Sequence, residues 1–437
     1  MAGDVIVIGG GLAGLSCAHA LCDSGVAVRV LEAEAAVGGR ARTTWHEGRP
    51  VDRGFQVMFS RYPELRKLMR RVGIGDGDVR PFDGGAVVLG GSRTRMLRAG
   101  PPPRLGGLGM GDRLRMARLA VEVRAVNAVR QLEHDASNRT TAEHLADLGF
   151  SAVAIDEVFR PILGVVFMNH ALEADGGYFR YLAGLLARGQ AALPSDGLGM
   201  IAEWTAKAIR QMGGRIDTGR AVTELLRDGE GGIRGVRTAD GETIAAQRVV
   251  LATEAPVTAR MLQAAGDDLA SKRVPEERAS TVSAAFALSR SLYRGRAIIV
   301  NGAPRSETAA GVPRVDLVAQ TTNVTRPGAA SGPHIVLATT VTTPDGGSAD
   351  GFEEAVAAQI QRWNPGFPWR DVAVPLGTTV HEFGQYQVKP GVRTGLPPQT
   401  TAIRGLVIGG DLTEMPSLEG AVMSGARAAE VVRALPA

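Results

Sequence analysis

Three glycines near the N-terminus have the spacing of a dinucleotide-binding turn. Gly9, Gly11 and Gly14 form G-x-G-x-x-G directly after a run of four apolar residues. In such a turn the first glycine permits the bend, the second lets a pyrophosphate approach the backbone, and the third lets the helix pack closely on the strand. The backbone N–H groups at the start of the following helix, at Leu12 and Ala13, would bind phosphate.

An acidic residue completes this motif. We expect a helix over residues 12–24 and a second strand over residues 26–31, after which come Glu32 and Ala33. A carboxylate at the end of that strand accepts hydrogen bonds from ribose hydroxyls and repels a 2′-phosphate. A glycine-rich turn in an ordinary α/β core would account for the glycines but not for the acid. The sequence therefore predicts a strand–helix–strand unit that binds a dinucleotide.

Two further glycine-rich turns could reach the same ligand. Gly39 and Arg40 follow the second strand, and a guanidinium there would pair in a bidentate way with the pyrophosphate. Near the C-terminus, Gly410 and Asp411 end an apolar strand. A helix expected over residues 417–435 then opens with the sequence Glu-Gly-Ala.

These motifs together resemble the FAD flavoproteins of the glutathione-reductase-like type. Within them, the chain is similar to the superfamily of amine oxidases, protoporphyrinogen oxidases and phytoene (carotenoid) desaturases. The C-terminal stretch GGDLTEMPSLEGAVMSG is especially similar to the desaturase branch. The resemblance implies an α/β (α+β overall) fold, in which a Rossmann FAD-binding domain carries an inserted substrate domain of mixed or antiparallel sheet and helices.

The resemblance also implies particular cofactor contacts. Asp411 would accept from a ribityl hydroxyl, the backbone at Val222 would meet the adenine, and the stretch with Gly54 and Phe55 would lie beside the flavin ring. The C-terminal helix would aim its N–H groups at the N1–C2=O edge of the flavin, where its dipole favours the reduced form. The helix residues implied are Glu419, Gly420 and Ala421. The alternative is an ordinary helix capped by Ser417.

The FAD is expected to be non-covalent, because the last cysteine is Cys22 and no cysteinyl–flavin bond can form near the C-terminus. We expect the FAD-binding domain to comprise residues 1–60, 190–262 and 400–437. The substrate-binding domain would comprise residues 61–189 and 263–399.

Three residues are candidates for catalysis. Tyr386 and Lys389 lie in HEFGQYQVKPG, where the family often has an Ala-Leu-Pro-like sequence, and either could face the substrate. His170 is a candidate base, although a lone histidine is more often structural. It lies in the apolar stretch 159–186, whose aromatic residues would line a pocket or belong to the core. Hydride transfer itself is the chemistry of the flavin.

The sequence leaves four functions open. The first is FAD-dependent desaturation or dehydrogenation of an apolar, small-molecule substrate. The second is amine oxidation with O2 as acceptor, and the third is flavin-dependent isomerisation without net redox change. A pure FAD-binding scaffold is a fourth reading. The acceptor of the electrons would be O2 or a quinone.

Composition limits the partners and the location. The net charge of +4 is dispersed among interspersed acids, so we expect no nucleic-acid partner. Two cysteines, few for 437 residues, suit a reducing compartment, and we expect a cytoplasmic protein. The arginine-rich helix expected over residues 112–131 is either a peripheral membrane contact or a solvated helix whose apolar stripe faces the core. The sequence leaves the oligomeric state open.

Overall fold

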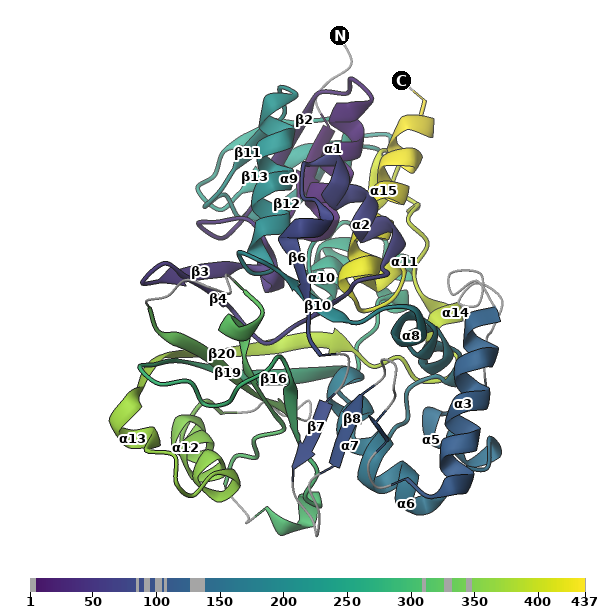
Figure 1. Cartoon of the computed structure of the whole chain (residues 1–437). Coiled ribbons are helices and arrows are strands. Elements are labelled where there is room, and N and C mark those ends of the chain that lie inside the picture. Colours follow the sequence, from purple (N-terminus) through teal and green to yellow (C-terminus); the bar gives the residue numbers. More distant parts are fainter. Residues whose placement is uncertain are drawn as a thin grey trace.

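The computed structural model describes residues 5–83, 86–89, 95–98, 104–105, 108–125, 138–308, 312–325, 332–342 and 348–436. The chain forms two layered halves (Figure 1). One half is built around a parallel sheet flanked by helices, and the other around a large mixed sheet. Both termini lie at the far end of the first half.

The parallel sheet has the strand order β11-β2-β1-β15-β21. Its strands are β1 (Val5–Ile8), β2 (Val28–Leu31), β11 (Arg215–Asp217), β15 (Arg248–Leu251) and β21 (Leu406–Ile408). Val7 of β1 pairs with Val30 on one side and Val250 on the other. All four residues of β1 are buried, as a strand covered on both faces requires. The expected strand–helix–strand unit is confirmed, with helix α1 at Leu12–Asp23.

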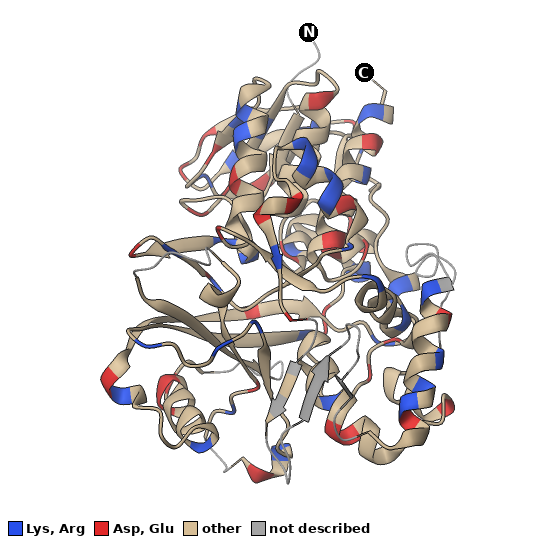
Figure 2. Cartoon of the chain, in the orientation of Figure 1, with Lys and Arg blue, Asp and Glu red and all other residues tan. Residues whose placement is uncertain are grey.

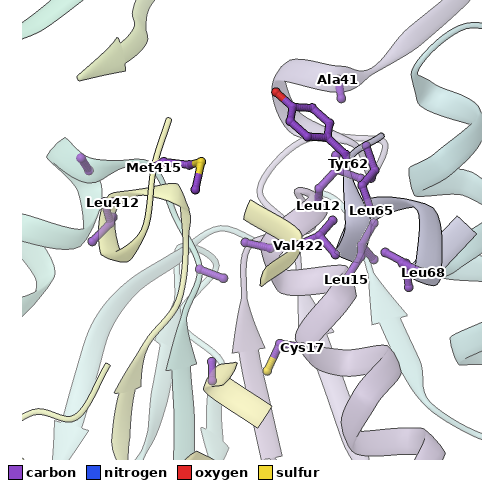
Figure 3. Close-up of a cluster of buried hydrophobic side chains, with 14 of the residues drawn as sticks. Leu12, Leu15, Cys17, Ala41, Tyr62, Leu65, Leu68, Leu412, Met415 and Val422 are labelled. Atoms are coloured by element: carbon purple, nitrogen blue, oxygen red, sulfur yellow. The ribbon is translucent and has the colours of Figure 1, made fainter. Parts of the chain in front are cut away.

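Four helices pack near this sheet. They are α1, α2 (Pro63–Arg71), α9 (Gly199–Gln211) and α15 (Leu418–Ala434). Figure 3 shows Leu12 and Leu15 of α1 beside Leu65 of α2 and Val422 of α15. The N-terminal and C-terminal helices therefore share one core.

The second half is built on an eight-stranded mixed sheet with the order β20-β16-β19-β18-β17-β7-β8-β9. Its strands are β7 (Ala86–Leu89), β8 (Arg95–Arg98), β9 (Arg104–Leu105), β16 (Arg278–Leu288), β17 (Ile298–Asn301), β18 (Leu317–Gln320), β19 (His334–Thr342) and β20 (Ala373–Tyr386). The expected fold class, a Rossmann-like half with a mixed sheet, is confirmed. The expected strand at residues 372–380 was too short, because β20 continues to Tyr386.

The two faces of the mixed sheet have different neighbours. One face, with Val282 and Phe286, packs on helix α12 (Phe352–Trp363). The opposite face, with Ala287 and Leu337, packs on Val51. Val51 belongs to the hairpin of β3 (Thr43–His46) and β4 (Arg49–Asp52), so this second face is turned toward the parallel-sheet half.

Shorter elements connect the halves. The small sheets are β5 (Met58–Phe59), β10 (Ala191–Pro194) and β6 (Val79–Pro81), and β12 (Val222–Arg227), β13 (Ile233–Thr238) and β14 (Thr243–Ala245). The other helices are α3 (Met110–Ala125), α5 (Thr141–Asp147), α6 (Ala152–Ala154), α7 (Arg160–Val166), α8 (Gly176–Arg188), α10 (Ala255–Ala264), α11 (Asp268–Arg273), α13 (Trp369–Val372) and α14 (Val392–Gly395). A π-helical turn, Ile155–Phe159, joins α6 to α7.

The expected domain boundaries stay a prediction. They assign α2 to the substrate domain, and in the structure α2 lies against α15.

The rotation of the basic helix α3 differs from one of the two alternatives given for it, a solvated helix whose apolar stripe faces the core. Leu114 and Val121 belong to that stripe, and their side chains are 65% and 69% exposed. Leu119 and Val123 are buried instead, together with Asp112, whose carboxylate accepts hydrogen bonds from Ser151. This buried carboxylate holds one end of the helix in this rotation.

Figure 2 shows basic residues along α3. Residues 126–131 of the expected helix lie outside the described residues.

Within the part of the chain that the structure describes, no helix combines the length and the apolar character needed to cross a bilayer.

We predict that Gly425→Ala destabilises the protein, although alanine ordinarily favours a helix interior. A Cβ atom at Gly425 of α15 would lie 2.2 Å from the carbonyl oxygen of Ala13 in α1. Separating the two helices should lower the free energy of unfolding by about 1–3 kcal/mol. Thermal or chemical denaturation measures this, with Gly229→Ala as control because Gly229 has open space before it. Equal stability of both variants would contradict the packing.

Candidate functional site

The glycine-rich turn lies between β1 and α1, at the carboxyl edge of the parallel sheet. A Cβ atom at Gly14 would lie 2.0 Å from the carbonyl oxygen of Gly9, and one at Gly9 would lie 2.5 Å from that of Ala252. Both glycines are therefore needed by the fold. Gly11 is different, because no described atom lies within 4 Å of a Cβ atom built there. Packing does not require this glycine, and its open approach fits a phosphate group above the buried start of α1, where Leu12 and Ala13 lie.

Glu32 lies at the end of β2 with only 8% of its surface exposed. Its carboxylate accepts hydrogen bonds from the N–H of Gly10 at 2.5 Å and of Glu34 at 2.8 Å. The carbonyl oxygen of Glu32 accepts from the N–H of Arg220, two residues before Val222. The segments implied for ribose and adenine thus meet beside Ala33, which is exposed.

A buried ion pair connects the two ends of the chain. Arg40 donates to Asp411 Oδ2 at 2.8 Å and to the carbonyl oxygen of Gly384 at 2.7 Å. Burial acts to lower the pKa of Arg40, but the carboxylates of Asp411 and Glu254 outweigh it and raise that pKa. The turn before Arg40 reaches the first glycine turn, since a Cβ atom at Gly39 would lie 3.5 Å from the Cα of Gly11.

The start of α15 is held by protein groups. Ser417 caps the helix, since its side chain accepts from the N–H of Gly420 at 2.9 Å. A Cβ atom at Gly420 would lie 2.1 Å from the carbonyl oxygen of Met415, so this glycine is required by the chain itself. Ala421 follows one residue later, and its N–H donates to the carbonyl oxygen of Ser417.

Glu419 has a structural role at α2. Its carboxylate accepts from the N–H groups of Glu64 and Leu65 at 2.9 and 2.8 Å, where α2 begins. Burial raises the pKa of Glu419 to about 7. A contact of this residue with the cofactor stays a prediction, and the structure commits its side chain to α2.

Gly54 and Phe55 lie where the two halves meet. Phe55 packs against Val51 and Leu337 and makes an edge contact with Phe82 at 6.1 Å between ring centroids. Gly54 lies beside the mixed sheet, on the face that is turned away from α12. The stretch implied to flank the flavin ring therefore contacts the mixed sheet, on the face that is turned away from α12.

The three catalytic candidates are not brought together. Tyr386 is fully buried, and its hydroxyl donates to the carbonyl oxygen of Glu414 at 3.1 Å. Lys389 forms ion pairs with Glu277 at 2.6 Å and Glu173 at 3.3 Å, and its side chain is 36% exposed. These contacts give Tyr386 and Lys389 structural partners, and their catalytic roles stay predictions.

His170 is also engaged with the protein. Its Nε2 lies 3.5 Å from Oδ2 of the buried Asp316, which in turn pairs with Arg314 and Arg305. A Cβ atom at Gly164 would lie 2.4 Å from His170 Nδ1, so the other edge of the ring packs on α7. The role of His170 as a base stays a prediction.

A strained turn next to β20 was not foreseen. Met168 and Leu172 have positive φ angles of 52° and 59°, which are unusual for large side chains. Gln385 donates to the carbonyl oxygen of Phe167, and Gln387 donates to that of Met168. The Met168 side chain consequently lies against Gly384, the residue whose carbonyl oxygen accepts from Arg40.

His381 was also overlooked, although it begins the stretch that drew attention to Tyr386. Its ring hydrogen-bonds to the backbone of Arg53, and its Nε2 is buried without a hydrogen-bond partner among the described residues. A Cβ atom at Gly54 would lie 3.3 Å from this nitrogen. The sequence offered one indication of this residue: a histidine directly after a segment expected to form a strand of the substrate domain.

The comparison with family models identifies the chain. The model of flavin containing amine oxidoreductases matches residues 12–433. The chain belongs to this family. FAD is the cofactor that the family uses, and the open approach at Gly11 and the acid at the end of β2 fit it.

Curated relatives match only in part. Coproporphyrinogen III oxidase of Mycobacterium leprae (strain TN) is 28% identical over 177 residues, which cover 38% of this chain and 37% of the relative. Carotenoid phi-ring synthase of Streptomyces griseus is 42% identical over 73 residues, covering 16% and 14%. The matched stretches thus span little more than a third, or less, of these relatives.

Solved structures match over almost the whole chain. An oxidoreductase from Methanosarcina mazei has a TM-score of 0.75 at 18% identity, covering 98% of this chain and 100% of that one. Putrescine oxidase with bound putrescine has a TM-score of 0.70 at 17% identity, covering 99% of both chains. At these identities the likeness shows the fold alone.

We predict that Gly11→Val weakens FAD binding by about tenfold or more without destabilising the apoprotein. The new side chain would occupy the approach to the helix N-terminus, where it meets no protein atom. Equilibrium titration with FAD and thermal unfolding of the apoprotein measure the two effects. Gly366→Val, at another glycine with open space, is the control. Stoichiometric, tightly bound FAD in the Gly11 variant would refute the pyrophosphate assignment.

We predict a pH dependence of stability that originates at Glu419. Its pKa is raised from 4.5 to about 7, so between these values the native state holds a proton that the unfolded state has lost. The free energy of unfolding must therefore fall as the pH rises through this window, by up to about 3 kcal/mol.

Chemical denaturation of the wild type and Glu419→Gln from acidic to neutral pH checks this. The wild type should lose stability relative to Glu419→Gln as the pH rises, because the variant has no group to ionise there. Glu430→Gln, an exposed position on the same helix, should follow the wild type. Parallel curves for all three proteins would contradict the assignment.

Proposed function

We propose that this protein dehydrogenates a carbon–carbon bond of an apolar small molecule, with FAD as the acceptor of the hydride. When bound, FAD supplies the electron-accepting ring, and the residues of the chain bind it, orient the substrate and exclude water. Gly11, Glu32, Arg40 and Asp411 would hold the cofactor.

The observation that carries this proposal is the apolar surface beside Gly54, where Phe55 packs on the cluster of Val300, Leu317 and Ala319. The nearby cations already have carboxylates beside them: Arg40 is paired with Asp411, and Glu254 lies near both Arg40 and Arg53. An uncharged carbon skeleton needs no counterion there. The two residues expected to face the substrate have other contacts, since Tyr386 is buried and Lys389 is paired with two glutamates.

The lining of the mixed sheet supports an apolar substrate. On the face turned away from α12, Leu317 and Ala319 pack with Val300 against Phe55 and Val165. One relative is named for a carotenoid, an apolar molecule, whereas two others are named for amines.

Amine oxidation is the second candidate. It is favoured by the name of the family and by the fold shared with putrescine oxidase. An isomerisation without net redox change is the third. The electron acceptor, O2 or a quinone, and a peripheral contact of α3 with a membrane belong to the proposal as well.

Anaerobic mixing of the FAD-loaded protein with candidate substrates tests the proposal. Phytoene in lipid vesicles, an uncharged hydrocarbon, should bleach the oxidised flavin spectrum, and putrescine should not. Bleaching by putrescine alone would replace the proposal with amine oxidation. Conversion of a probe without bleaching would indicate isomerisation.

The acceptor is then identified by reoxidation. Reduced protein is mixed with air or, anaerobically, with a soluble quinone. Rapid return of the oxidised spectrum in air points to O2, and return only with the quinone points to a dehydrogenase.

A further inference from the structure

We propose that Nε2 of His381 accepts the proton that the dehydrogenation releases. This inference rests on the proposed function. Removing two hydrogens from adjacent carbons takes one as a hydride, to bound FAD, and the other as a proton. The electron pair of the second C–H bond becomes the new π bond. The proton passes from the imidazolium to solvent when O2 or a quinone reoxidises the cofactor.

The position of His381 follows from strand register. It lies opposite Thr281, and the preceding pairs along β20 and β16 include Thr379 with Ser283. Ser283 in turn shares a hydrogen bond of 2.8 Å with Thr339 of β19. Because directly opposed residues share a face, these polar groups form one patch on an otherwise apolar sheet face.

The patch lies directly beneath Gly54. A Cβ atom there would lie 3.3 Å from His381 Nε2 and 3.5 Å from Ser283 Oγ. The φ angle of Gly54 lies outside the left-handed region, so its conformation does not require glycine. Without a side chain at this position, the backbone of Gly54 lies close to Nε2, beside the stretch implied to flank the flavin.

The chemistry of the ring suits a proton acceptor. The hydrogen bond to the backbone of Arg53 uses one ring nitrogen as a donor, which leaves Nε2 with a lone pair. A buried acceptor without a donor costs free energy, so its presence calls for an explanation, and a catalytic role is one. His170 Nε2 is likewise buried without a hydrogen-bond partner among the described residues, but it lies 3.5 Å from Oδ2 of Asp316.

The surroundings keep His381 uncharged at neutral pH. Burial lowers its pKa first, and the charges of Arg53 and Arg40 lower it further. On the paired strand its neighbours are the uncharged Thr281 and Ser283, and the adjacent Glu382 is exposed to solvent. The free base is therefore available.

The connection to the cofactor runs along the same strand. Arg40, which we place at the pyrophosphate, donates to the carbonyl oxygen of Gly384, three residues after His381. A negative charge that develops on the reduced cofactor should therefore raise the pKa of His381. Reduction would then draw a proton onto the ring.

The first experiment measures the protons taken up when bound FAD is reduced, from the pH dependence of its reduction potential over roughly pH 5 to 8. Wild type and the control His334→Gln should take up more protons per two electrons than His381→Gln, with an excess approaching one. All three proteins should bind FAD with similar spectra. Equal proton uptake by the three would overturn the role of His381, whereas a wild type that binds no FAD would overturn the proposed function.

A second measurement does not depend on that variant. The wild type is labelled at histidine Cε1 and titrated by NMR with FAD oxidised and reduced. One of the seven histidines should show a midpoint below its usual range that rises on reduction, and substitution of the other six assigns it to His381 by elimination. If no histidine midpoint changes on reduction, or if another histidine carries the change, the inference is wrong.

Discussion

The ion pair between Arg40 and Asp411 is the interaction on which the site depends. It joins residues 371 positions apart, and the same guanidinium also holds the backbone of Gly384 in β20. The parallel-sheet half, the C-terminal turn and the floor of the second half are thus fixed by one side chain. The Arg40 side chain is partly exposed, but Asp411 is buried, so removing Arg40 would leave a buried carboxylate without its partner, at a cost of up to about 3 kcal/mol. The ion pair therefore positions Asp411 and Gly384 relative to the turn before Arg40.

Much of the nucleotide half could be predicted from the sequence because its signals are local. The turn itself needs glycines, since Gly9 has a φ angle of 108° and a Cβ atom at Gly14 would lie 2.0 Å from the carbonyl oxygen of Gly9. The acid at the end of β2 follows at a fixed spacing. Gly420 shows the limit of this reasoning. The resemblance implied that Gly420 contacts the flavin. The carbonyl oxygen of Met415 already requires a glycine at this position.

The catalytic half could not be predicted, because side-chain direction there depends on register. The pairing of β20 with β16 shifts between Ala279 and Thr281, and again between Ala285 and Phe286. Each irregularity changes which face a residue reaches, so alternation along β20 does not indicate that His381 lies under Gly54. Lys389 was a candidate because it lies where the family often has an Ala-Leu-Pro-like sequence, but its partners Glu173 and Glu277 are remote in sequence.

The start of α15 shows how structural and functional demands coexist in one element. Ser417 and the C-terminal helix were considered either as an ordinary cap or as a dipole aimed at the flavin. Ser417 satisfies the N–H of Gly420 only, while Glu419 turns its side chain away to cap α2. A side-chain cap satisfies one of the orphan donors and leaves the helix dipole intact. The cap fixes the axis of the helix, and a fixed axis is what a dipole needs in order to act on a ligand.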